Sequence, residues 1–396
     1  MPGSKILAGA RTPMGKLSGA LASMQAVDLG GVAIRGALER AGVRPEDVDY
    51  VFMGHVLQAG AGQATARQAA AKGGIPMSVP ATTVNKVCLS GLNAIYLADQ
   101  LIASGDAEIV VAGGMESMTN APHLLPGARA GYRLGDAKVV DAMMHDGLFC
   151  AFDVCSMGEG TENYVASTSG VTRERQDALA ALSHERAAVA AKEGRLGDEI
   201  IPVPVPQRKG DPVPFEADEG IRPGTTTESL GGLRPAFTKD GTITAGNASQ
   251  ISDGAAAVVV ASAAAAERLG VEPLGEVVSY GQVAGPDPSL LHQPSAAARR
   301  ALDKAGLSVG DVDLWELNEA FAAVVVASMD DLGIGTDVTN VNGGAIALGH
   351  PIGMSGTRLA FSLLLELRRR GGGTGVAALC GGGGQGDGIV VRAGSR

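Results

Sequence analysis

The chain has 396 residues and a mass of 39.8 kDa, which exceeds one ordinary hydrophobic core and predicts two or three domains. Hydrophobic residues make up 45% of the chain and aromatic residues only 3%, and the 58 glycines indicate close-packed elements and tight turns, which favours an α/β protein. A formal net charge of −10 argues against a nucleic-acid partner, and the longest apolar run, 255–266, is too short to span a membrane.

Neither end of the sequence carries a recognised targeting signal. The N-terminus lacks a charged region followed by a cleavable apolar stretch, and the C-terminal Ala-Gly-Ser-Arg matches no address motif, so we expect a cytoplasmic protein. The four cysteines are then expected to be reduced thiols. Each must be judged from its neighbours as a core residue, a metal ligand or a nucleophile.

The chain contains an internal repeat. Residues 37–49 recur at 301–313, where seven of the thirteen positions are identical. Each copy predicts a helix that ends at a glycine C-cap, followed by a turn and a strand. An apolar helix and a buried strand that ends in a glycine turn follow both copies, at 92–103 and 109–114 and again at 357–370 and 376–382. The chain is therefore predicted to consist of two duplicated α/β halves.

The composition changes between the halves. Residues 119–246 hold proline-rich and charged segments and one amphipathic helix, predicted at 173–193. This stretch is expected to be an inserted loop domain. The predicted division is residues 1–118 plus 247–270 for the first half, 119–246 for the insert and 271–396 for the second half.

Cys88 is the first candidate for chemistry. It follows Asn85-Lys-Val and precedes Ser90-Gly91 at the start of a predicted helix. Backbone N–H groups and the helix dipole favour a thiolate at such a position, which is consistent with a nucleophile. The alternative is a small buried thiol at a strand-to-helix turn.

The second half offers two partners for Cys88. His350 lies in the glycine-rich loop 342–356, where it could act as a base, and Cys380 lies at a strand end before the glycines of 381–386. Each residue on its own could equally be structural. Because corresponding loops of two related halves would meet at their interface, we expect Cys88, His350 and Cys380 in one pocket. Two thiols and a base indicate acyl transfer.

Other candidates are weaker. Asn318 follows a predicted strand and could orient a water or donate to an oxyanion, or simply cap a turn. Cys150 and Cys155, with His145 nearby, lack a second ligand pair for zinc, so we expect them to pack and predict no metal site. The segment 60–65 lacks the third glycine of a dinucleotide-binding loop.

Six segments together resemble the thiolase family across essentially the whole chain. They are 10–13, 85–92, 113–118, 318–321, 343–356 and 380–386. The resemblance implies a thiolase fold of the α/β class, in which duplicated αβα halves form a five-layered αβαβα core. Each half is expected to hold a five-stranded mixed sheet, and the inserted loop domain is expected to cover the coenzyme.

The resemblance also implies roles. Cys88 would be the nucleophile that becomes acylated, His350 the base that activates it, and Cys380 the group that moves the α-proton. One oxyanion hole is implied between His350 and a water held by Asn318, and a second between the backbone N–H groups of Cys88 and Gly382. The implied reaction is the reversible ping-pong condensation of two acetyl-CoA molecules to acetoacetyl-CoA and CoA.

Positions near the insert match coenzyme and acyl contacts of the family. Arg222, Ser229 and Ser249 match coenzyme-contacting positions, although each could instead cap a loop, and Met157 resembles a residue that lines the acyl pocket. Three positions depart from the family pattern: Ser156 stands where many acetoacetyl-specific members have His, and Gly is frequent at the positions of Leu89 and Gln250. The length of the acyl chain therefore stays open.

Two alternatives remain for the function. One is a degradative 3-oxoacyl-CoA thiolase of fatty-acid β-oxidation with broader chain length, and the other is a thiolase-fold protein that binds acyl-CoA or lipid without catalysis. CoA would be a co-substrate rather than a tightly bound cofactor, and neither nucleic acid nor membrane is expected as a partner. The resemblance further implies a homotetramer, a dimer of dimers paired through the segment near His123 to Asp136.

Overall fold

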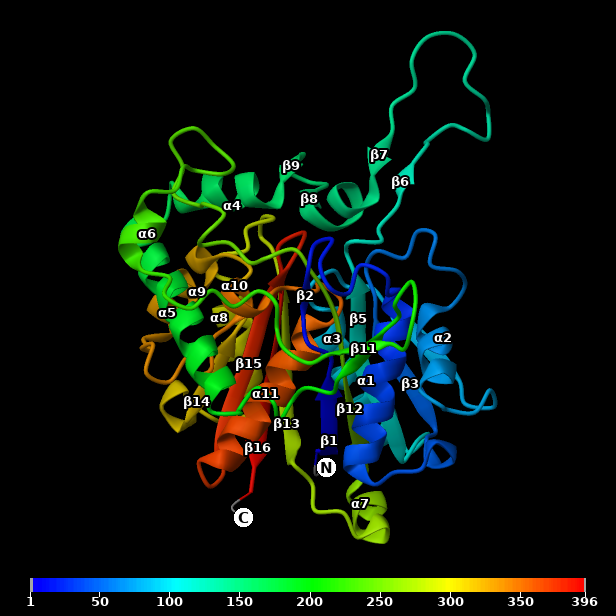
Figure 1. The fold of residues 1–396 in the computed structure, drawn as a ribbon. Helices are drawn as coiled ribbons and strands as arrows, with labels where there is room; N and C mark the ends of the chain where they lie inside the picture. Colours follow the sequence, from blue (N-terminus) through cyan, green and yellow to red (C-terminus); the bar gives the residue numbers. More distant parts are fainter. Residues whose placement is uncertain (1–2, 395–396) are drawn as a thin grey trace.

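The computed structural model of the protein describes residues 3–394, which form a large mixed sheet covered by helices (Figure 1). The strands follow one another in the order β14-β15-β16-β13-β1-β12-β5-β3-β4, and the short β2 pairs with β12. Their bounds are β1 (Lys5–Arg11), β2 (Gly15–Lys16), β3 (Tyr50–Gly54), β4 (Ala81–Val84), β5 (Ile109–Ser117), β12 (Ser252–Ala261), β13 (Gly275–Ala284), β14 (Leu314–Leu317), β15 (Gly373–Gly381) and β16 (Gln385–Ala393). Within residues 3–394, none of the helices is long and apolar enough to cross a membrane.

The sheet confirms the predicted duplication. In the first half β3 pairs with β5 in parallel, β5 with β12 antiparallel and β12 with β1 antiparallel. The second half repeats this pattern with β14, β15, β16 and β13. The two sets join where β1 pairs antiparallel with β13, with Lys5 opposite Glu276 and Ile6 opposite Gly275.

The halves differ at the outer edge of the sheet. The five strands β1, β3, β4, β5 and β12 belong to the first half, whereas the second half has four, because the counterpart of β4 is reduced to one parallel bridge between Thr339 and Trp315. The Asn340 side chain replaces the missing ladder: it accepts a hydrogen bond from Leu317 N at 2.8 Å and donates one to Leu317 O at 2.8 Å. Five strands in each half were expected, and the second half is one short for this reason.

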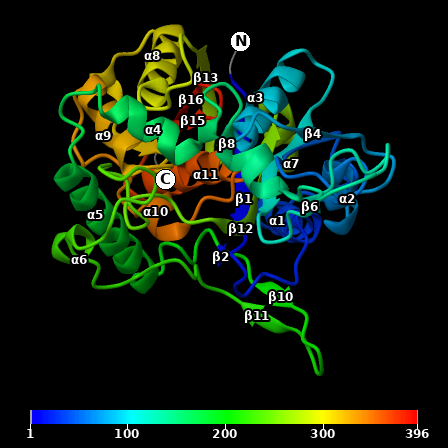
Figure 2. The same cartoon turned by 90° about the horizontal axis from the view of Figure 1, so that it is seen from above.

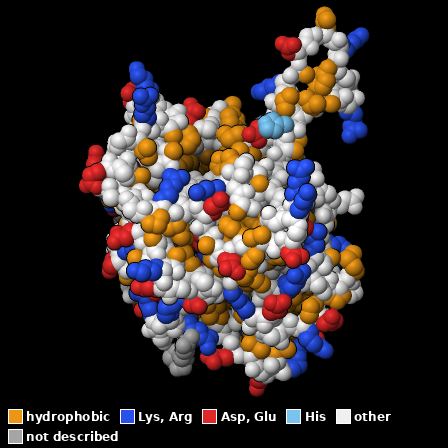
Figure 3. Space-filling model, viewed as in Figure 1, with side chains coloured by type: hydrophobic (Ala, Val, Ile, Leu, Met, Phe, Trp, Pro, Cys, Tyr) orange, Lys and Arg blue, Asp and Glu red, His pale blue; other side chains and the backbone are white. Residues whose placement is uncertain are grey.

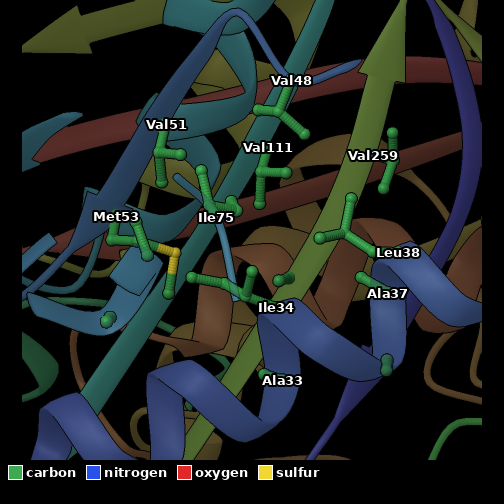
Figure 4. Packing of buried hydrophobic residues seen from close by; sticks show 14 of the residues in the cluster. Ala33, Ile34, Ala37, Leu38, Val48, Val51, Met53, Ile75, Val111 and Val259 are labelled. Carbon is green, nitrogen blue, oxygen red and sulfur yellow. The ribbon is translucent and has the colours of Figure 1, made fainter. Parts of the chain in front are cut away.

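Helices cover both faces of each half in matching positions. The outer layers are α1 (Ala26–Ala41) with α2 (Thr65–Lys72) and α8 (Gln293–Ala305) with α9 (Ala322–Leu332), and the central layer is α3 (Ser90–Ala103) with α11 (Ser355–Arg369). Helices α1 and α8 both end at the predicted glycines, Gly42 and Gly306, whose φ angles of 64° and 68° are left-handed. Figure 4 shows Ile34 and Leu38 of α1 packed towards Val111 and Val259 of the sheet, and burying each such side chain contributes about 1.5–3 kcal/mol.

The insert takes the place of a tight turn. In the second half Gly382–Gly384 join β15 directly to β16, whereas in the first half the whole insert separates β5 from β12. Its first part, residues 123–165, lies across one end of the sheet, above the carboxyl end of β5, whereas residues 173–192 run along the side of the second half and residues 203–215 lie near α1. The elements of the insert are seen from above in Figure 2. They are β6 (His123–Leu124), β7 (Val140–Asp141), a π-helix (Met143–Leu148), β8 (Phe149–Cys150), β9 (Cys155–Ser156), α4 (Met157–Val165), α5 (Arg173–Lys192), β10 (Val203–Val205), β11 (Val213–Phe215) and α6 (Thr227–Gly231).

The remaining short elements follow the insert or connect the larger ones. They are two 3-10 turns (Pro45–Asp47 and Val309–Asp311), α7 (Ala263–Leu269) and α10 (Ala345–Leu348). The helix predicted at 173–193 is α5, and the apolar run at 255–266 forms most of the fully buried strand β12.

An arm between β6 and β7, residues 125–139, projects away from the body of the molecule (Figure 1).

Candidate active site

The first turns of α3 and α11 touch at the centre of the molecule, where the two halves meet. Thr357 Oγ1 donates a hydrogen bond to Gly91 O at 2.9 Å. A Cβ on Gly91 would lie 2.9 Å from Gly353 O, and one on Gly356 would lie 2.4 Å from Leu92 N, so this approach requires glycine. The contact brings the loop before α3, which carries Cys88, against the loop before α11, which carries His350.

Cys88 lies on a strained turn between β4 and α3. The preceding residue, Val87, has a φ of 51°, which is unusual for a β-branched residue. Three hydrogen bonds hold this turn: Val87 N donates to Asn85 Oδ1 at 3.1 Å, Lys86 N to Ser90 Oγ at 2.8 Å, and Ser90 Oγ to Val87 O at 2.6 Å. Backbone strain that the surroundings enforce is typical of functional sites.

An ion pair ties the same turn to the second half. Lys86 Nζ lies 2.7 Å from Asp387 Oδ1 on β16, and the Tyr280 hydroxyl of β13 donates to Asp387 Oδ2 at 2.6 Å. The Asp387 side chain is fully buried, whereas that of Lys86 is 20% exposed. Tyr280 in turn stacks on Tyr96 of α3, with ring centroids 4.4 Å apart. The position of the Cys88 turn thus depends on both halves.

His350 is anchored on one side of its ring. Its backbone N donates to Gln250 O at 3.0 Å, and its Nδ1 lies 2.6 Å from Ser355 Oγ. The Ser355 hydroxyl donates its proton to Pro351 O at 3.0 Å, so Nδ1 must be the donor and Nε2 carries the lone pair. This tautomer, assigned from the hydrogen bonds, is the one required for a base that acts through Nε2.

Asn318 lies directly behind His350. Its side chain is fully buried at the exit of β14, and its Nδ2 lies 3.5 Å from His350 Nε2, at the outer limit of a hydrogen bond. Its Oδ1 is buried and has no hydrogen-bond partner in the described part of the chain. A buried, unpaired amide oxygen costs free energy unless it accepts a hydrogen bond from a ligand or water, which makes Asn318 Oδ1 a candidate for such a contact.

One small cavity joins the predicted groups. It has a volume of about 60 Å³, and its lining includes Cys88, His350, Cys380, Gly382 and, from α4, Met157. Cys380 is the penultimate residue of β15 and is 1% exposed, and Gly382 follows in the turn that leads to β16. Cys380, on the strand of the second half that corresponds to β5, therefore lines the same cavity as the Cys88 turn of the first half.

A larger cavity of about 290 Å³ adjoins the small one. Six residues line both cavities: Leu148, Met157, Ser249, Phe321, His350 and Ile352. Most of the remaining lining is apolar and comes from the insert and its neighbours, including Met118, Met144 and Phe237. An acyl-thioester arm could reach the thiols through this space.

Burial governs the protonation of the three groups. It raises the pKa of Cys88 to about 12, although the N–H groups of Cys88 and Gly382 oppose the shift, and it raises the pKa of Cys380 far above that of a free thiol. Burial, with the nearby Arg358 charge, lowers the pKa of His350 to about 4. The helix start was expected to favour a thiolate at Cys88, but desolvation outweighs that effect, so the resting pair is a neutral thiol and a neutral imidazole.

Glu116 joins the loops of both halves next to this site. Its buried carboxylate accepts hydrogen bonds from Val56 N at 3.1 Å, Leu57 N at 3.0 Å and Gly353 N at 2.9 Å. Burial raises its pKa to about 7, while the three N–H donors act in the opposite direction. His55 Nε2 lies 3.4 Å away, and because burial lowers the pKa of His55 to about 4, this contact joins a neutral ring to the carboxyl group.

Only two of the four predicted coenzyme and acyl contacts line the cavities. Met157 and Ser249 line both cavities, whereas Arg222 and Ser229 are exposed near α6 and line neither. The Ser229 hydroxyl forms a capping box with Thr226. This is the structural alternative that the sequence left open.

At each of the three positions that depart from the family pattern, the side chain makes a defined local contact. Ser156 caps α4 by accepting a hydrogen bond from Glu159 N at 3.2 Å. Leu89 is fully buried against Gly381, where a Cβ would lie 2.6 Å from Leu89 Cγ. The Gln250 amide donates to Ile346 O at 2.9 Å and so ties its loop to α10.

Several residues of the site were not singled out from the sequence. Lys86, Glu116 and Asp387 act through contacts with residues far away in the chain, whereas Ser355 contacts His350 five residues earlier and so offered a local signal. In residues 3–394, no three His, Cys, Asp or Glu side chains gather as a potential metal site.

Comparison with known proteins identifies the family. The profile of the thiolase N-terminal domain matches residues 4–264, and that of the thiolase C-terminal domain matches residues 271–393. A "Probable acetyl-CoA acetyltransferase" of Mycolicibacterium smegmatis is 57% identical over 98% of this chain and 100% of its own. An acetyl-CoA acetyltransferase of Cupriavidus necator is 54% identical over 98% of both chains.

A solved structure shows the same fold. The crystal structure of the Bacillus anthracis acetyl-CoA acetyltransferase superimposes with a TM-score of 0.96 at 40% sequence identity and covers 99% of both chains. The duplicated sheet, the inserted segment and the two matched domains agree with this assignment. The chain is an enzyme of the thiolase family and has the thiolase fold.

Proposed function

We propose that this enzyme catalyses the reversible condensation of two acetyl-CoA molecules to acetoacetyl-CoA and CoA. The observation that carries the proposal is the meeting of two thiols and a neutral imidazole, Cys88, Cys380 and His350, in one cavity of about 60 Å³. A cavity of this size suits a short acyl group. The names of the relatives, acetyl-CoA acetyltransferases, support the same substrate.

In the first half-reaction Cys88 Sγ attacks the carbonyl carbon of acetyl-CoA. Its proton moves to His350 Nε2, because the neutral ring can accept it while the thiol alone would ionise too rarely. The N–H groups of Cys88 and Gly382 stabilise the tetrahedral oxyanion. The C–S bond to CoA then breaks, CoA takes the proton from His350, and acetyl-Cys88 remains.

In the second half-reaction the Cys380 thiol first gives its proton to the neutral His350 Nε2, and the resulting thiolate removes an α-proton from a new acetyl-CoA. A thiol of raised pKa gives a thiolate of high basicity, which suits proton abstraction from a weakly acidic carbon. His350 and a water on Asn318 are proposed to stabilise the enolate oxygen. The carbanion attacks the carbonyl carbon of acetyl-Cys88, and the bond to Cys88 Sγ breaks. His350 Nε2 then returns its proton to the Cys88 thiolate, Cys380 keeps the α-proton as a thiol, and acetoacetyl-CoA is released.

Trapping the intermediate tests this division of labour. After incubation with labelled acetyl-CoA, peptide mass spectrometry should find the acetyl group on Cys88. A Cys88→Ala variant should lose transfer activity, and a Cys380→Ser variant should keep acylation of Cys88 but lose most of the condensation. Persistent transfer by Cys88→Ala, or equal loss of both half-reactions in Cys380→Ser, would contradict the mechanism.

A second candidate is a 3-oxoacyl-CoA thiolase of broader chain length. The apolar cavity of about 290 Å³ beside the thiols favours it, since that space could hold a longer acyl chain as well as the coenzyme arm. Thiolysis rates of 3-oxoacyl-CoA substrates from four to sixteen carbons separate the two. Highest activity at four carbons supports the acetyl-specific enzyme, and highest activity at eight or more supports the alternative.

The coenzyme and assembly are part of the same proposal. CoA is proposed as co-substrate, with Ser249 and Met157 in the cavity wall and with Arg222 and Ser229 available on the insert surface for its outer portion. A cytoplasmic homotetramer paired through the arm near His123 to Asp136 is proposed. The projection of that arm supports such a contact (Figure 1).

A further inference from the structure

The proposed reaction uses two of the four cysteines. The other two face one another in the insert. Cys150 on β8 pairs directly with Cys155 on β9 across a hairpin closed by residues 151–154. Opposed residues of antiparallel strands have Cα atoms about 4.5 or 5.5 Å apart. Disulfides span Cα separations of about 4.4–6.8 Å, so the separation set by this register lies within the range of a disulfide.

Both side chains lie on the same side of the hairpin, against the first turns of α4. A Cβ on Gly160 of α4 would lie 3.4 Å from Cys155 Sγ. Cys150 lines a small cavity of about 10 Å³ together with the same Gly160. Gly160 therefore lies beside both cysteines, and its lack of a side chain leaves space next to Cys155 Sγ.

The two thiols differ in access. Cys150 is 3% exposed, and its Sγ accepts a hydrogen bond from Asp153 N at 3.3 Å, whereas Cys155 is partly exposed. Burial and the neighbouring carboxylates of Glu159 and Asp153 raise the pKa of Cys155. A small oxidant can therefore reach Cys155 first, and Cys150 is placed to attack the product from inside the hairpin.

We propose that Cys150 and Cys155 form a reversible thiol–disulfide exchange site, separate from the catalytic thiols. With glutathione disulfide as oxidant, the Cys155 thiolate attacks one sulfur and releases one glutathione. Cys150 then loses its proton, attacks Cys155 Sγ and releases the second glutathione. Two protein thiols are oxidised and one glutathione disulfide is reduced to two glutathione molecules.

The hairpin connects this chemistry to the rim of the active site. Phe152 in its loop packs on the turn of the second half, where a Cβ on Gly383 would lie 3.0 Å from Phe152 Cε2. Met157, two residues after Cys155, lines both cavities. A bond between Cys150 and Cys155 would close the base of this loop and fix the start of α4.

The sequence makes the test direct. Trypsin leaves Cys150 and Cys155 together on one peptide, 139–173, because no Lys or Arg lies between them, and it places Cys88 and Cys380 on two other peptides. The full-length enzyme would be equilibrated with glutathione and glutathione disulfide at a series of ratios, quenched with acid, alkylated and digested. The two thiols should become protected from alkylation together, and the oxidised peptide should be unalkylated and two hydrogen atoms lighter than the free dithiol.

Single variants identify the order of attack. Cys150→Ser should accumulate one glutathione on Cys155, whereas Cys155→Ser should leave Cys150 reduced under the same conditions. The wild-type measurement needs no variant, so a folding defect does not affect it. The proposal fails if both thiols remain alkylatable at every ratio, or if the disulfide that forms joins Cys88 to Cys380 while the 139–173 peptide stays reduced.

Discussion

His350 has the protonation state and the orientation that a general base needs. Burial keeps the ring neutral, and Ser355 fixes the tautomer that presents Nε2. Cys88 next to it is held as a thiol by the same burial. At the residue scale, Cys88 and His350 thus both stay neutral in the proposed mechanism until a thioester is bound. The backbone N–H groups of Cys88 and Gly382 then stabilise the negative charge that develops on the thioester oxygen.

Ser355 is predicted to be a positioning residue for His350. A Ser355→Ala variant should lower kcat by roughly 10- to 100-fold with little change in KM, because loss of the buried hydrogen bond frees Nδ1 and the ring orientation. Ser362→Ala on the same helix is the control, since the buried Ser362 hydroxyl has no hydrogen-bond partner within residues 3–394. If steady-state kinetics showed equal effects of Ser355→Ala and Ser362→Ala, or full activity for Ser355→Ala, Ser355 would not have this role.

The raised pKa of Cys88 predicts the pH dependence of its reactivity. Only the thiolate reacts with iodoacetamide, and with a pKa of about 12 its fraction grows with pH over the whole accessible range. The alkylation rate of Cys88, followed by peptide mass spectrometry in the absence of CoA, should therefore keep rising beyond pH 9, by about tenfold per pH unit. A plateau near neutral pH would instead indicate a preformed thiolate–imidazolium pair.

At the scale of elements, the Cys88 turn is held by contacts from both halves. Its own hydrogen bonds fix Val87 in a left-handed conformation, while Lys86 reaches Asp387 on β16. Helices α3 and α11 meet through glycines at their first turns. These contacts explain why the strained conformation of Val87 persists, because they hold the Cys88 turn in place from both halves.

The Lys86–Asp387 pair is predicted to support this turn. Lys86→Met leaves the buried Asp387 carboxylate without its cation and should lower the free energy of unfolding by about 3–5 kcal/mol and slow acylation of Cys88. The exposed pair Lys72–Asp28, also at 2.7 Å, is the control, and Lys72→Met should cost at most about 1 kcal/mol. Urea unfolding and the acylation rate measure the two effects, and a Lys86→Arg variant should restore part of both.

At the scale of the whole molecule, two copies of one α/β unit share a single sheet and a central helical layer. The insert occupies the place where the second half has only a glycine turn, so it lies directly over the ends of β5 and β15. The arm at 125–139 extends beyond this cover and carries hydrophobic side chains on its surface (Figure 3). They are Leu125, Tyr132, Leu134 and Val139.

The arm is predicted to join two dimers. Leu134 is fully exposed, and an aspartate there should disrupt an apolar contact between copies. Sedimentation velocity should find a tetramer for the wild type and a dimer for Leu134→Asp. Val213→Asp, at an exposed valine of β11 outside the arm, is the control and should leave the assembly unchanged. Identical sedimentation of the two variants would exclude the arm as the contact.

The sequence by itself determined the local features of this protein. The repeat predicted the matching helices α1 and α8 with their glycine caps, and the strand-to-helix positions of Cys88 and His350 followed from glycine spacing and apolar runs. These depend on neighbours a few residues apart, which a single sequence displays. The family resemblance rested on such local motifs and was confirmed by the matched domains.

Only the tertiary structure decided the properties that arise from distant residues. The pKa of Cys88 is raised because burial outweighs the helix start, and Lys86 and Glu116 contact partners in the other half of the chain. The second half lost a strand because the Asn340 side chain supplies its hydrogen bonds. Desolvation and side-chain contacts of this kind depend on how the two halves pack, and no local pattern in the sequence records that packing.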